Sequence, residues 1–476
     1  MRNRSFPRER LSPIIILVVM AMIPAAMFGY AWRWAAARQV RPAPAEAVAV
    51  VALPAPLTTP VLSLRRAPQT LASTTNEAGF ASKLADLSAF VGDTSCLVVL
   101  LDGRSILNHG GDMPITPASN EKLLTASVAL EALGPDYTFS TKLLGAVTNG
   151  VVAGDLYFVG GGDPLLSTAD YPASITLERH PPTNVTQLET LVANLMAAGV
   201  TSIQGNIVGD DSRYDTERFV PSWGNQIAGI EAGPLGALMV NDATRTLGTV
   251  VRYPDPAVGA ATDLKTLLVN AGITVRGRPV SGTAPPDTPE IAAVQSAPLA
   301  TIIAGMLTAS DDNTAELLLK EIGFHYNGSG TRAAGIEVIK GTLTTWGIDA
   351  TKVAPVDGSG LDGGNVVTCD ILLQVLLHAP LTGPVGAGLP IAGQTGTLYN
   401  QFLDTPMVGR LHAKTGTLRN AKALTGYVDT TAGQIEFSLI LDFDNAASNY
   451  AGVWQALGQT FSTYPTGPTI EQLQPR

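Results

Sequence analysis

Hydrophobic and polar positions recur with different periods along this chain of 476 residues, and each period predicts one type of element. Apolar residues spaced three or four apart between 80 and 91 indicate a helix, so ordered structure is expected from about Asn76. The unbroken apolar run CLVVLL at 96–101 predicts a buried strand, and Asp102-Gly103 after it predicts a turn.

The pattern changes in the middle of the chain. From about Phe139 to Glu290, Gly, Pro and Asp separate short strand-like runs, and helical spacing occurs only near 187–198 and 263–270. This pattern predicts an inserted α+β domain, with bounds at 141–290. Afterwards helices are predicted at 297–308, 314–322, 334–346 and 449–461, and strands at 423–428 and 435–441.

The N-terminal segment is basic and then apolar. Four arginines precede a charge-free run from Leu11 to Trp32, which is long enough to cross the roughly 30 Å of hydrocarbon in a bilayer. Residues 1–34 are therefore expected to be a cytoplasmic tail and a single-pass anchor in the cell membrane, with the bulk of the chain extracytoplasmic. A signal peptide that is cleaved before secretion is the alternative. Residues 35–75, rich in Ala and Pro, are expected to form an extended tether.

Composition narrows the function classes. Apolar residues make up 45% of the chain and charged residues 15%, which is typical of a globular protein. A net charge of −10 without a basic stripe argues against a nucleic-acid partner. Because no CxxC or HxxxH spacing occurs, no metal is expected. Cys96 and Cys369 either form one disulfide outside the cytoplasm or are two buried small residues.

A serine and a lysine stand three residues apart in the string PASNEK. Pro117 leads into a helix predicted from about Ser119 to Leu133 and ended by Gly134. Residues three apart share one helix face, so the amine of Lys122 can reach the hydroxyl of Ser119 and take its proton. The string predicts a serine nucleophile with a lysine base.

A second polar string, HAKTGTL, lies on a predicted strand and contains Lys414, Thr415, Gly416 and Thr417. A lysine and a hydroxyl there can hold a substrate carboxylate by charge-assisted hydrogen bonds. Gly416 permits close approach of the substrate to the edge of the strand. Lys414 and Thr415 are therefore candidate substrate-binding residues.

The motifs SxxK and KTG, with SDN between them, are together the signature of penicillin-binding proteins and serine β-lactamases. Longer strings make the chain resemble peptidase family S13, the D-Ala-D-Ala carboxypeptidases that carry an inserted domain between the first two motifs. The resemblance spans roughly residues 82–464. The strings that carry it are PASNEKLLTASVALEALGPDYTF (117–139), GGGDPLL (160–166), VDGSGLDGGNVVT (356–368), LPIAGQTGTL (389–398) and AKTGTLRNAKALTGYV (413–428).

The middle motif departs from the family pattern, which is Ser-x-Asn. Aligning the following Ala-Glu pair places Ser310 at the motif serine and Asp312 at its asparagine. The alternative alignment places Asn313 at the asparagine and loses the serine. An aspartate can accept a hydrogen bond from Lys122, but it would stabilise the ammonium form and oppose the role of that lysine as a free-amine base.

The resemblance implies an α+β fold in which a sheet is flanked by helices, as in penicillin-recognising enzymes. Residues 76–140 and 291–476 would form this catalytic domain. The implied substrates are the D-Ala-D-Ala ends of peptidoglycan stem peptides, the implied inhibitors are β-lactams, and no cofactor is implied. Endopeptidase action on cross-links is also common in the family.

The resemblance also implies an acyl-transfer mechanism. Ser119 would attack the carbonyl of the penultimate D-Ala, Lys122 would accept its proton, and Ser310 would relay a proton to the leaving D-Ala. The backbone N–H groups of Ser119 and Thr417 would form the oxyanion hole. The remaining alternatives are a β-lactamase, an esterase-like relative, and a catalytically weak protein that senses or scaffolds peptidoglycan, which Asp312 favours.

Overall fold

The computed structural model describes residues 27, 30, 33, 67–175 and 180–474. Two compact units make up the chain: residues 1–70 with 474–476, and residues 71–473. The expected membrane anchor lies outside the described residues, apart from three isolated positions. Among the helices that are described, none combines the length and the apolar character that a membrane span needs.

The tether expected at residues 35–75 was predicted to end too late in the sequence. Helix α2 (Ala67–Val91) already covers residues 67–75, which the sequence pattern predicted to be extended. Pro68 does not prevent this, because proline is tolerated in the first turn of a helix, where its missing N–H has no partner to lose.

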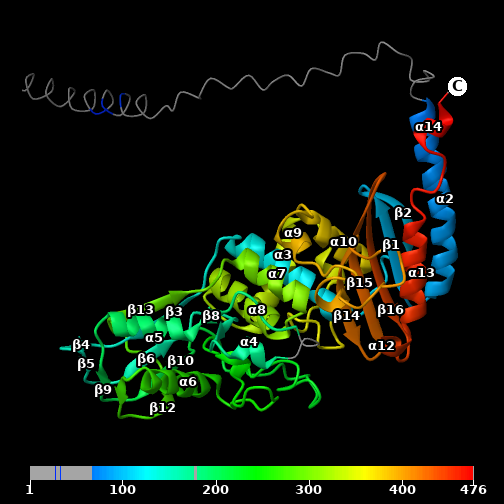
Figure 1. The fold of residues 1–476 in the computed structure, drawn as a ribbon. Helices are drawn as coiled ribbons and strands as arrows, with labels where there is room; N and C mark the ends of the chain where they lie inside the picture. Colours follow the sequence, from blue (N-terminus) through cyan, green and yellow to red (C-terminus); the bar gives the residue numbers. More distant parts are fainter. Residues whose placement is uncertain (1–26, 28–29, 31–32, 34–66, 176–179, 475–476) are drawn as a thin grey trace, which may run out of the picture. The chain divides into compact units, whose positions relative to one another are not determined.

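A five-stranded antiparallel sheet forms the centre of the fold (Figure 1). Its order is β14-β15-β16-β1-β2, so the C-terminal hairpins and the first strands of the chain share one sheet, and β14 is an edge strand. The strands are β1 (Cys96–Leu101), β2 (Arg104–His109), β14 (Leu411–Leu418), β15 (Ala421–Thr430) and β16 (Gly433–Asp442).

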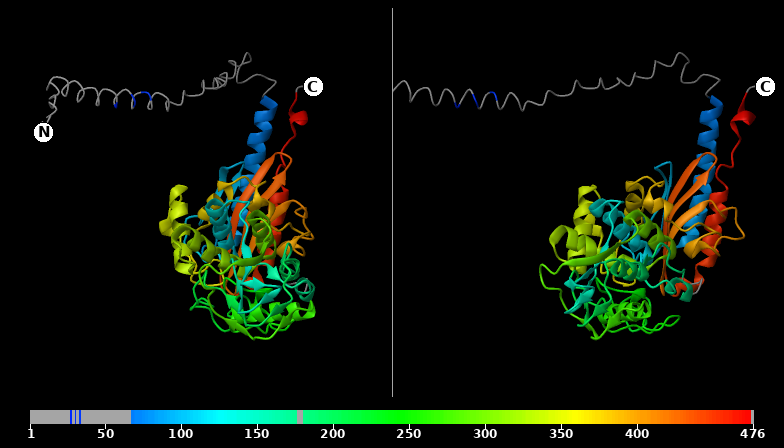
Figure 2. Two further views of the ribbon diagram at one scale, coloured as in Figure 1. Left: turned by 90° about the vertical axis from the view of Figure 1, so that its left-hand side faces the viewer. Right: turned by 60° about the vertical axis from the view of Figure 1, so that its left-hand side comes forward.

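Helices cover both faces of this sheet, as Figures 1 and 2 show. On one face, α2 and α13 (Ala451–Ser462) bury Phe80, Phe437 and Phe461 in a shared apolar cluster. The other face packs against helices from two distant parts of the chain. These are α3 (Glu121–Leu133), α7 (Leu299–Ala309), α8 (Asp312–Asn327), α9 (Arg332–Thr345) and α10 (Cys369–His378), with short α11 (Pro384–Ala387), α12 (Ala446–Asn449) and α14 (Ile470–Leu473) elsewhere.

A disulfide joins Cys96 on β1 to Cys369 at the start of α10. The two residues are 273 positions apart in the sequence. Of the two interpretations that the sequence left open, the bonded pair is the one that the structure contains. It links the sheet to the helical layer on one of its faces.

The chain between α3 and α7 forms further sheets with their own apolar core (Figure 1). Strands β3 (Ser140–Leu144) and β13 (Glu290–Gln295) pair antiparallel, so this part begins and ends side by side. Residues 71–473 form one compact unit, so the interpretation of residues 141–290 as a separate domain stays a prediction. The remaining elements are β4 (Val147–Thr148), β5 (Val151–Val152), β6 (Leu156–Val159), β7 (Leu166–Ser167), α4 (Tyr171–Ser174), β8 (Thr186–Gln187), α5 (Leu188–Ala197), β9 (Ser202–Ile203), β10 (Ile207–Asp210), α6 (Pro256–Asn270), β11 (Thr274–Val275) and β12 (Pro279–Ser281).

A loop-rich segment of the chain between α3 and α7 packs against α8. Tyr214, Val220 and Trp223 form an apolar cluster with Leu317 of α8 and Leu361. This cluster holds the loops of the insertion next to the N-terminal end of α8.

Candidate active site

Ser119 lies in a single 3-10 turn, Ala118–Asn120, that leads into α3. The predicted helix therefore begins two residues later as an α-helix, at Glu121. Ala118 has a φ of 48°, a left-handed conformation that is uncommon for a residue with a side chain. Because such backbone strain persists only where the surroundings enforce it, the turn is held in place from outside.

Two glycines allow that enforcement. A Cβ on Gly416 of β14 would lie 2.7 Å from the carbonyl oxygen of Pro117, and a Cβ on Gly360 would lie 1.9 Å from that of Ala118. Strand β14 and the loop around Gly360 thus approach the turn more closely than any other residue type would allow. The close approach that Gly416 permits in this structure is to the nucleophile turn, and its expected role in close approach of the substrate stays a prediction.

Lys122 is completely buried and all three of its N–H donors are used. Its Nζ donates to Ser119 Oγ at 3.1 Å, to Asp312 Oδ1 at 2.6 Å and to the carbonyl of Ser359 at 2.6 Å. The spacing of three residues thus brings the amine and the hydroxyl together as the sequence predicted. Two long-range partners fix the amine in that position.

Ser310 and Lys414 form the second contact of the site. Ser310 ends α7 in a left-handed conformation, with a φ of 60° and a ψ of 40°. Lys414 Nζ donates to Ser310 Oγ and to the carbonyl of Thr415, both at 2.7 Å. Since Lys414 has no exposed surface, its amine serves Ser310 in this structure, and its expected contact with a substrate carboxylate stays a prediction.

The geometry distinguishes the two alignments of the middle motif. Asp312 faces Lys122, whereas the side-chain oxygen of Asn313 accepts a hydrogen bond from the backbone N–H of Gly233 at 2.8 Å. Asn313 is buried away from Ser119, on the side of the inserted segment. Ser310 and Asp312 are the pair that lines the cleft, and Asn313 does not take part in it.

Burial shifts the pKa values of the Asp312 carboxyl and the Lys414 amine. It raises the pKa of the Asp312 carboxyl, although the neighbouring Lys122 opposes that shift. Burial, together with the charge of Lys122, holds the pKa of Lys414 well below its ordinary value. The site therefore contains a lysine-carboxylate pair next to a second lysine that is biased toward its neutral form.

The loop at 356–365 supports Lys122, a role that the sequence analysis did not predict. Glu316 Oε1 accepts the N–H groups of Gly358 at 3.0 Å and Ser359 at 2.8 Å, and so positions the carbonyl that holds Lys122. Burial and the carboxylate of Asp357 raise the pKa of Glu316 to about 8. Glu316 belongs to the Ala-Glu pair that aligned the middle motif, but the motif did not indicate that it holds the loop around Ser359.

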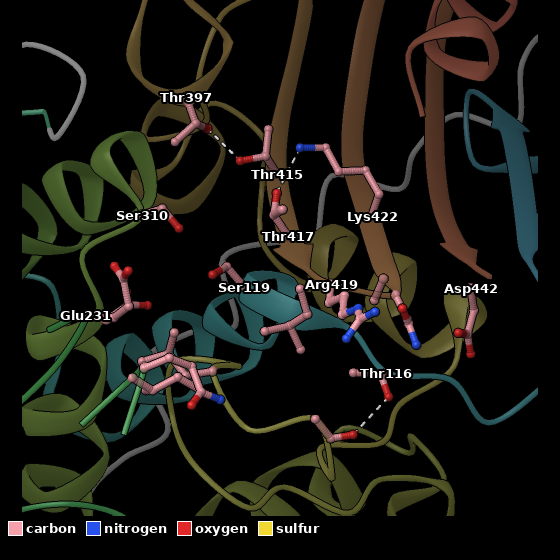
Figure 3. A pocket seen from close by; sticks show the side chains of 18 of the residues that line it. Thr116, Ser119, Glu231, Ser310, Thr397, Thr415, Thr417, Arg419, Lys422 and Asp442 are labelled. Atoms are coloured by element: carbon pink, nitrogen blue, oxygen red, sulfur yellow. Dashed lines mark hydrogen bonds between the residues drawn. The ribbon is translucent and has the colours of Figure 1, made fainter. Parts of the chain in front are cut away.

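A cleft of about 930 Å³ lies over Ser119, and Figure 3 shows its side chains. Ser310 and Asp312 line it together with Thr415 and Thr417 of β14. The hydroxyl of Thr415 shares a hydrogen bond of 2.6 Å with that of Thr397. Residues that the motifs did not indicate complete the wall; they include Gln226, Glu231, Arg419 and Lys422. In the described part of the chain, no acidic, histidine or cysteine cluster can hold a metal ion.

Comparisons with known proteins agree with this architecture. A family model described as the D-Ala-D-Ala carboxypeptidase 3 (S13) family matches residues 77–254 and 236–453. A D-alanyl-D-alanine carboxypeptidase of Actinomadura sp. (strain R39) is 28% identical over 429 residues, which cover 72% of this chain and 77% of the relative. A carboxypeptidase of Mycobacterium tuberculosis is 32% identical over 352 residues, with coverages of 70% and 72%.

A solved structure shares the fold. Penicillin binding protein 4 from Haemophilus influenzae superposes with a TM-score of 0.64 at 21% sequence identity. The superposition covers 78% of this chain and 98% of that protein. The α+β fold of penicillin-binding proteins that the resemblance implied is therefore confirmed.

Proposed function

Because the chain belongs to the D-Ala-D-Ala carboxypeptidase 3 (S13) family, we propose that it removes the terminal D-Ala of peptidoglycan stem peptides through an acyl-enzyme on Ser119. The observation that carries this proposal is the hydrogen bond of 3.1 Å between Lys122 Nζ and Ser119 Oγ on the floor of the cleft. A hydroxyl becomes a nucleophile when a positioned base takes its proton.

In the proposed first step, Ser119 Oγ attacks the carbonyl carbon of the penultimate D-Ala while Lys122 takes its proton. The developing oxyanion is stabilised by the backbone N–H groups of Ser119 and Thr417. Ser310 then passes a proton to the nitrogen of the leaving D-Ala as the peptide C–N bond breaks, and the proton that Lys122 took from Ser119 replaces it, so Lys122 returns to the free amine. Lys414 supports that transfer, because it donates to the Ser310 hydroxyl.

In the second step, water attacks the acyl-enzyme and Lys122 takes its proton. Lys122 returns that proton to Ser119 Oγ as the ester bond breaks, so Ser119 is regenerated and the shortened peptide leaves. Thr415 is the hydroxyl of the motif that lines the cleft and can meet the terminal carboxylate. β-Lactams carry an amide and a carboxylate in a similar arrangement, and we propose that they acylate Ser119. The same machinery would also cleave a cross-link that ends in D-Ala.

One observation favours a second function, that of a weakly catalytic protein that binds peptidoglycan. The carboxylate of Asp312 lies 2.6 Å from Lys122 Nζ and stabilises the ammonium form, which cannot accept the proton of Ser119. Acylation would then be slow while the cleft still binds stem peptides. The rates of acylation and deacylation distinguish this function from the first.

The experiment is intact-mass spectrometry after incubation with penicillin, followed by the rate of D-Ala release from a peptide ending in D-Ala-D-Ala. One covalent adduct and release of D-Ala are expected. Ser119→Ala should abolish both, and an adduct that persists in this variant would exclude Ser119 as the nucleophile. An adduct without turnover of the peptide would support the binding function instead.

We further propose that the protein acts outside the cytoplasm, attached to the cell membrane by residues 1–34. The basic and then apolar pattern of that segment supports the attachment. The disulfide between Cys96 and Cys369 supports the compartment, because disulfides persist in oxidising environments.

A further inference from the structure

A lysine outside the three motifs lines the same cleft. Lys422 lies on β15 directly across the hairpin from Thr417 of β14, and the pair is in register. Its Nζ donates to Thr417 Oγ1 at 2.8 Å. Figure 3 shows this amine reaching across from its own strand toward the hydroxyls of Thr415 and Thr417.

The charge of Lys422 has no acidic partner. Within the described ranges, no carboxylate forms an ion pair with it, and Thr417 is its one hydrogen-bond acceptor. An ammonium has three donors, so two are free of acceptors. The rings of Tyr450 and Trp454 lie 4.2 Å and 4.9 Å from the nitrogen and favour its charged form.

Lys414, by contrast, does not line the cleft. It has no exposed surface, and its amine is bonded to Ser310 and to the backbone of its own strand. Lys422 retains 9% of its surface exposed and lies on the cleft wall. A substrate carboxylate in the cleft therefore meets Lys422 without displacing any hydrogen bond between Lys414 and Ser310.

We propose that Lys422 determines substrate specificity by binding the terminal carboxylate of the substrate together with the hydroxyls of Thr415 and Thr417. This inference rests on the proposed function, in which the scissile carbonyl lies against the N–H of Thr417. The terminal residue then lies along β14, where these groups line the cleft. A carboxylate also supplies the buried ammonium with the opposite charge that it lacks.

Two peptides test whether Lys422 binds the terminal carboxylate. One is a diacylated L-Lys-D-Ala-D-Ala, and the other is its C-terminal amide, which lacks the negative charge. Lys422→Met should lower kcat/KM for the free acid by about 10- to 100-fold, the loss expected for a hydrogen bond to a charged group. For the amide the loss should stay within about threefold, because a neutral end makes only a neutral hydrogen bond. Equal losses for both peptides would overturn the proposal.

Two further variants separate direct contact from other effects. Lys422→Arg keeps the charge and should keep most of the preference for the free acid. Arg419→Gln removes a cation from the same cleft wall without touching Thr417, so the ratio between the two peptides should not change. If Arg419→Gln lowered the ratio as much as Lys422→Met, a general field of the cleft would explain the preference, and the proposal would fail.

The pH dependence provides an independent readout. Burial lowers the pKa of Lys422 to about 8, so its charge is present below that pH and is lost above it. In the wild type, the preference for the free acid should fall as the pH rises through about 8, and in Lys422→Arg it should not, because arginine stays protonated. The other charged or titratable groups on β14, β15 and β16, in the turn between β14 and β15 and at the start of α13 are the same in both proteins. They are His412, Lys414, Arg419, Tyr427, Asp429, Glu436, Asp442 and Tyr450.

Failure of the inference differs from failure of the proposed function. If wild-type protein does not release D-Ala in a reaction that depends on Ser119, both are overturned. If it does, but Lys422→Met leaves the ratio of the two peptides unchanged, only the role of Lys422 is overturned.

Discussion

The amine of Lys122 donates a hydrogen bond of 2.6 Å to the carboxylate of Asp312, which stands where the family motif has asparagine. Since the same amine also contacts Ser119, the proposed base of the reaction is held by a negative charge. We expect Asp312→Asn to increase the rate of acylation by penicillin at neutral pH by about 10-fold, because the variant removes the negative charge that holds the amine as an ammonium. The acylation rate of the variant should also begin to rise at a lower pH than that of the wild type. The measurement is the pH profile of the acylation rate.

Asn313→Ala is the matched control for that experiment. It removes a hydrogen bond to the backbone of Gly233 but no charge near Lys122, so it should cost about 1–2 kcal/mol of stability and leave the pH profile in place. If Asp312→Asn leaves the profile unshifted while Asn313→Ala is inactive, the alignment of the middle motif is refuted.

Lys414→Ala should impair acylation of both the free-acid peptide and its amide by similar factors. The physical reason is that Lys414 donates to Ser310 and does not line the cleft, so its loss disturbs proton transfer, which both substrates need. The expected loss corresponds to about 0.5–1.5 kcal/mol, the range for a hydrogen bond between neutral groups, because burial biases Lys414 toward its neutral form. A loss confined to the free acid would show instead that Lys414 meets the substrate carboxylate, as the motif alone suggests.

Glu316→Gln should change how stability depends on pH. Burial and Asp357 raise the pKa of Glu316 from 4.5 to about 8, so its contribution to stability is complete below about pH 4.5 and is lost as the pH rises through about 8. Glutamine cannot ionise, yet its oxygen can still accept the N–H groups of Gly358 and Ser359. Above pH 8 the variant should therefore be the more stable protein, by on the order of 2 kcal/mol in chemical unfolding.

The control for this experiment is Glu321→Gln, also on α8. Glu321 is buried but forms an ion pair of 2.6 Å with Arg213, so its replacement should destabilise the protein at neutral pH. If Glu316→Gln were destabilised in the same way above pH 8, the loop would require the charge of Glu316 and not only its oxygen.

The full-length protein should remain with the membrane fraction. The basic N-terminus and the charge-free run from Leu11 to Trp32 are the reason, because such a run is long enough to cross the bilayer. Carbonate washing should leave the penicillin-binding activity in the pellet. If washing releases all of it, and the released N-terminus maps after residue 30, the segment is a cleaved signal peptide instead.

The sequence by itself determined the local chemistry of the protein. The spacing of three places Ser119 and Lys122 about one helical turn apart, and the motif strings by themselves indicate the family. The strand at 96–101 was predictable for a similar reason, because an unbroken apolar run of this length is typical of a strand that is buried on both faces. Such features depend on neighbours within a few residues.

The tertiary structure decided what depends on distant residues. Lys122 and Asp312 are 190 positions apart, and only the packing of α3 against α8 determines that Asp312 and not Asn313 meets the amine. The bond between Cys96 and Cys369 and the position of Lys422 on the cleft wall arise in the same way. Hydrogen bonds and charges act over a few ångströms, whereas the spacing of a sequence constrains positions only along the chain, so these contacts exist once the sheet and its helical layers have assembled.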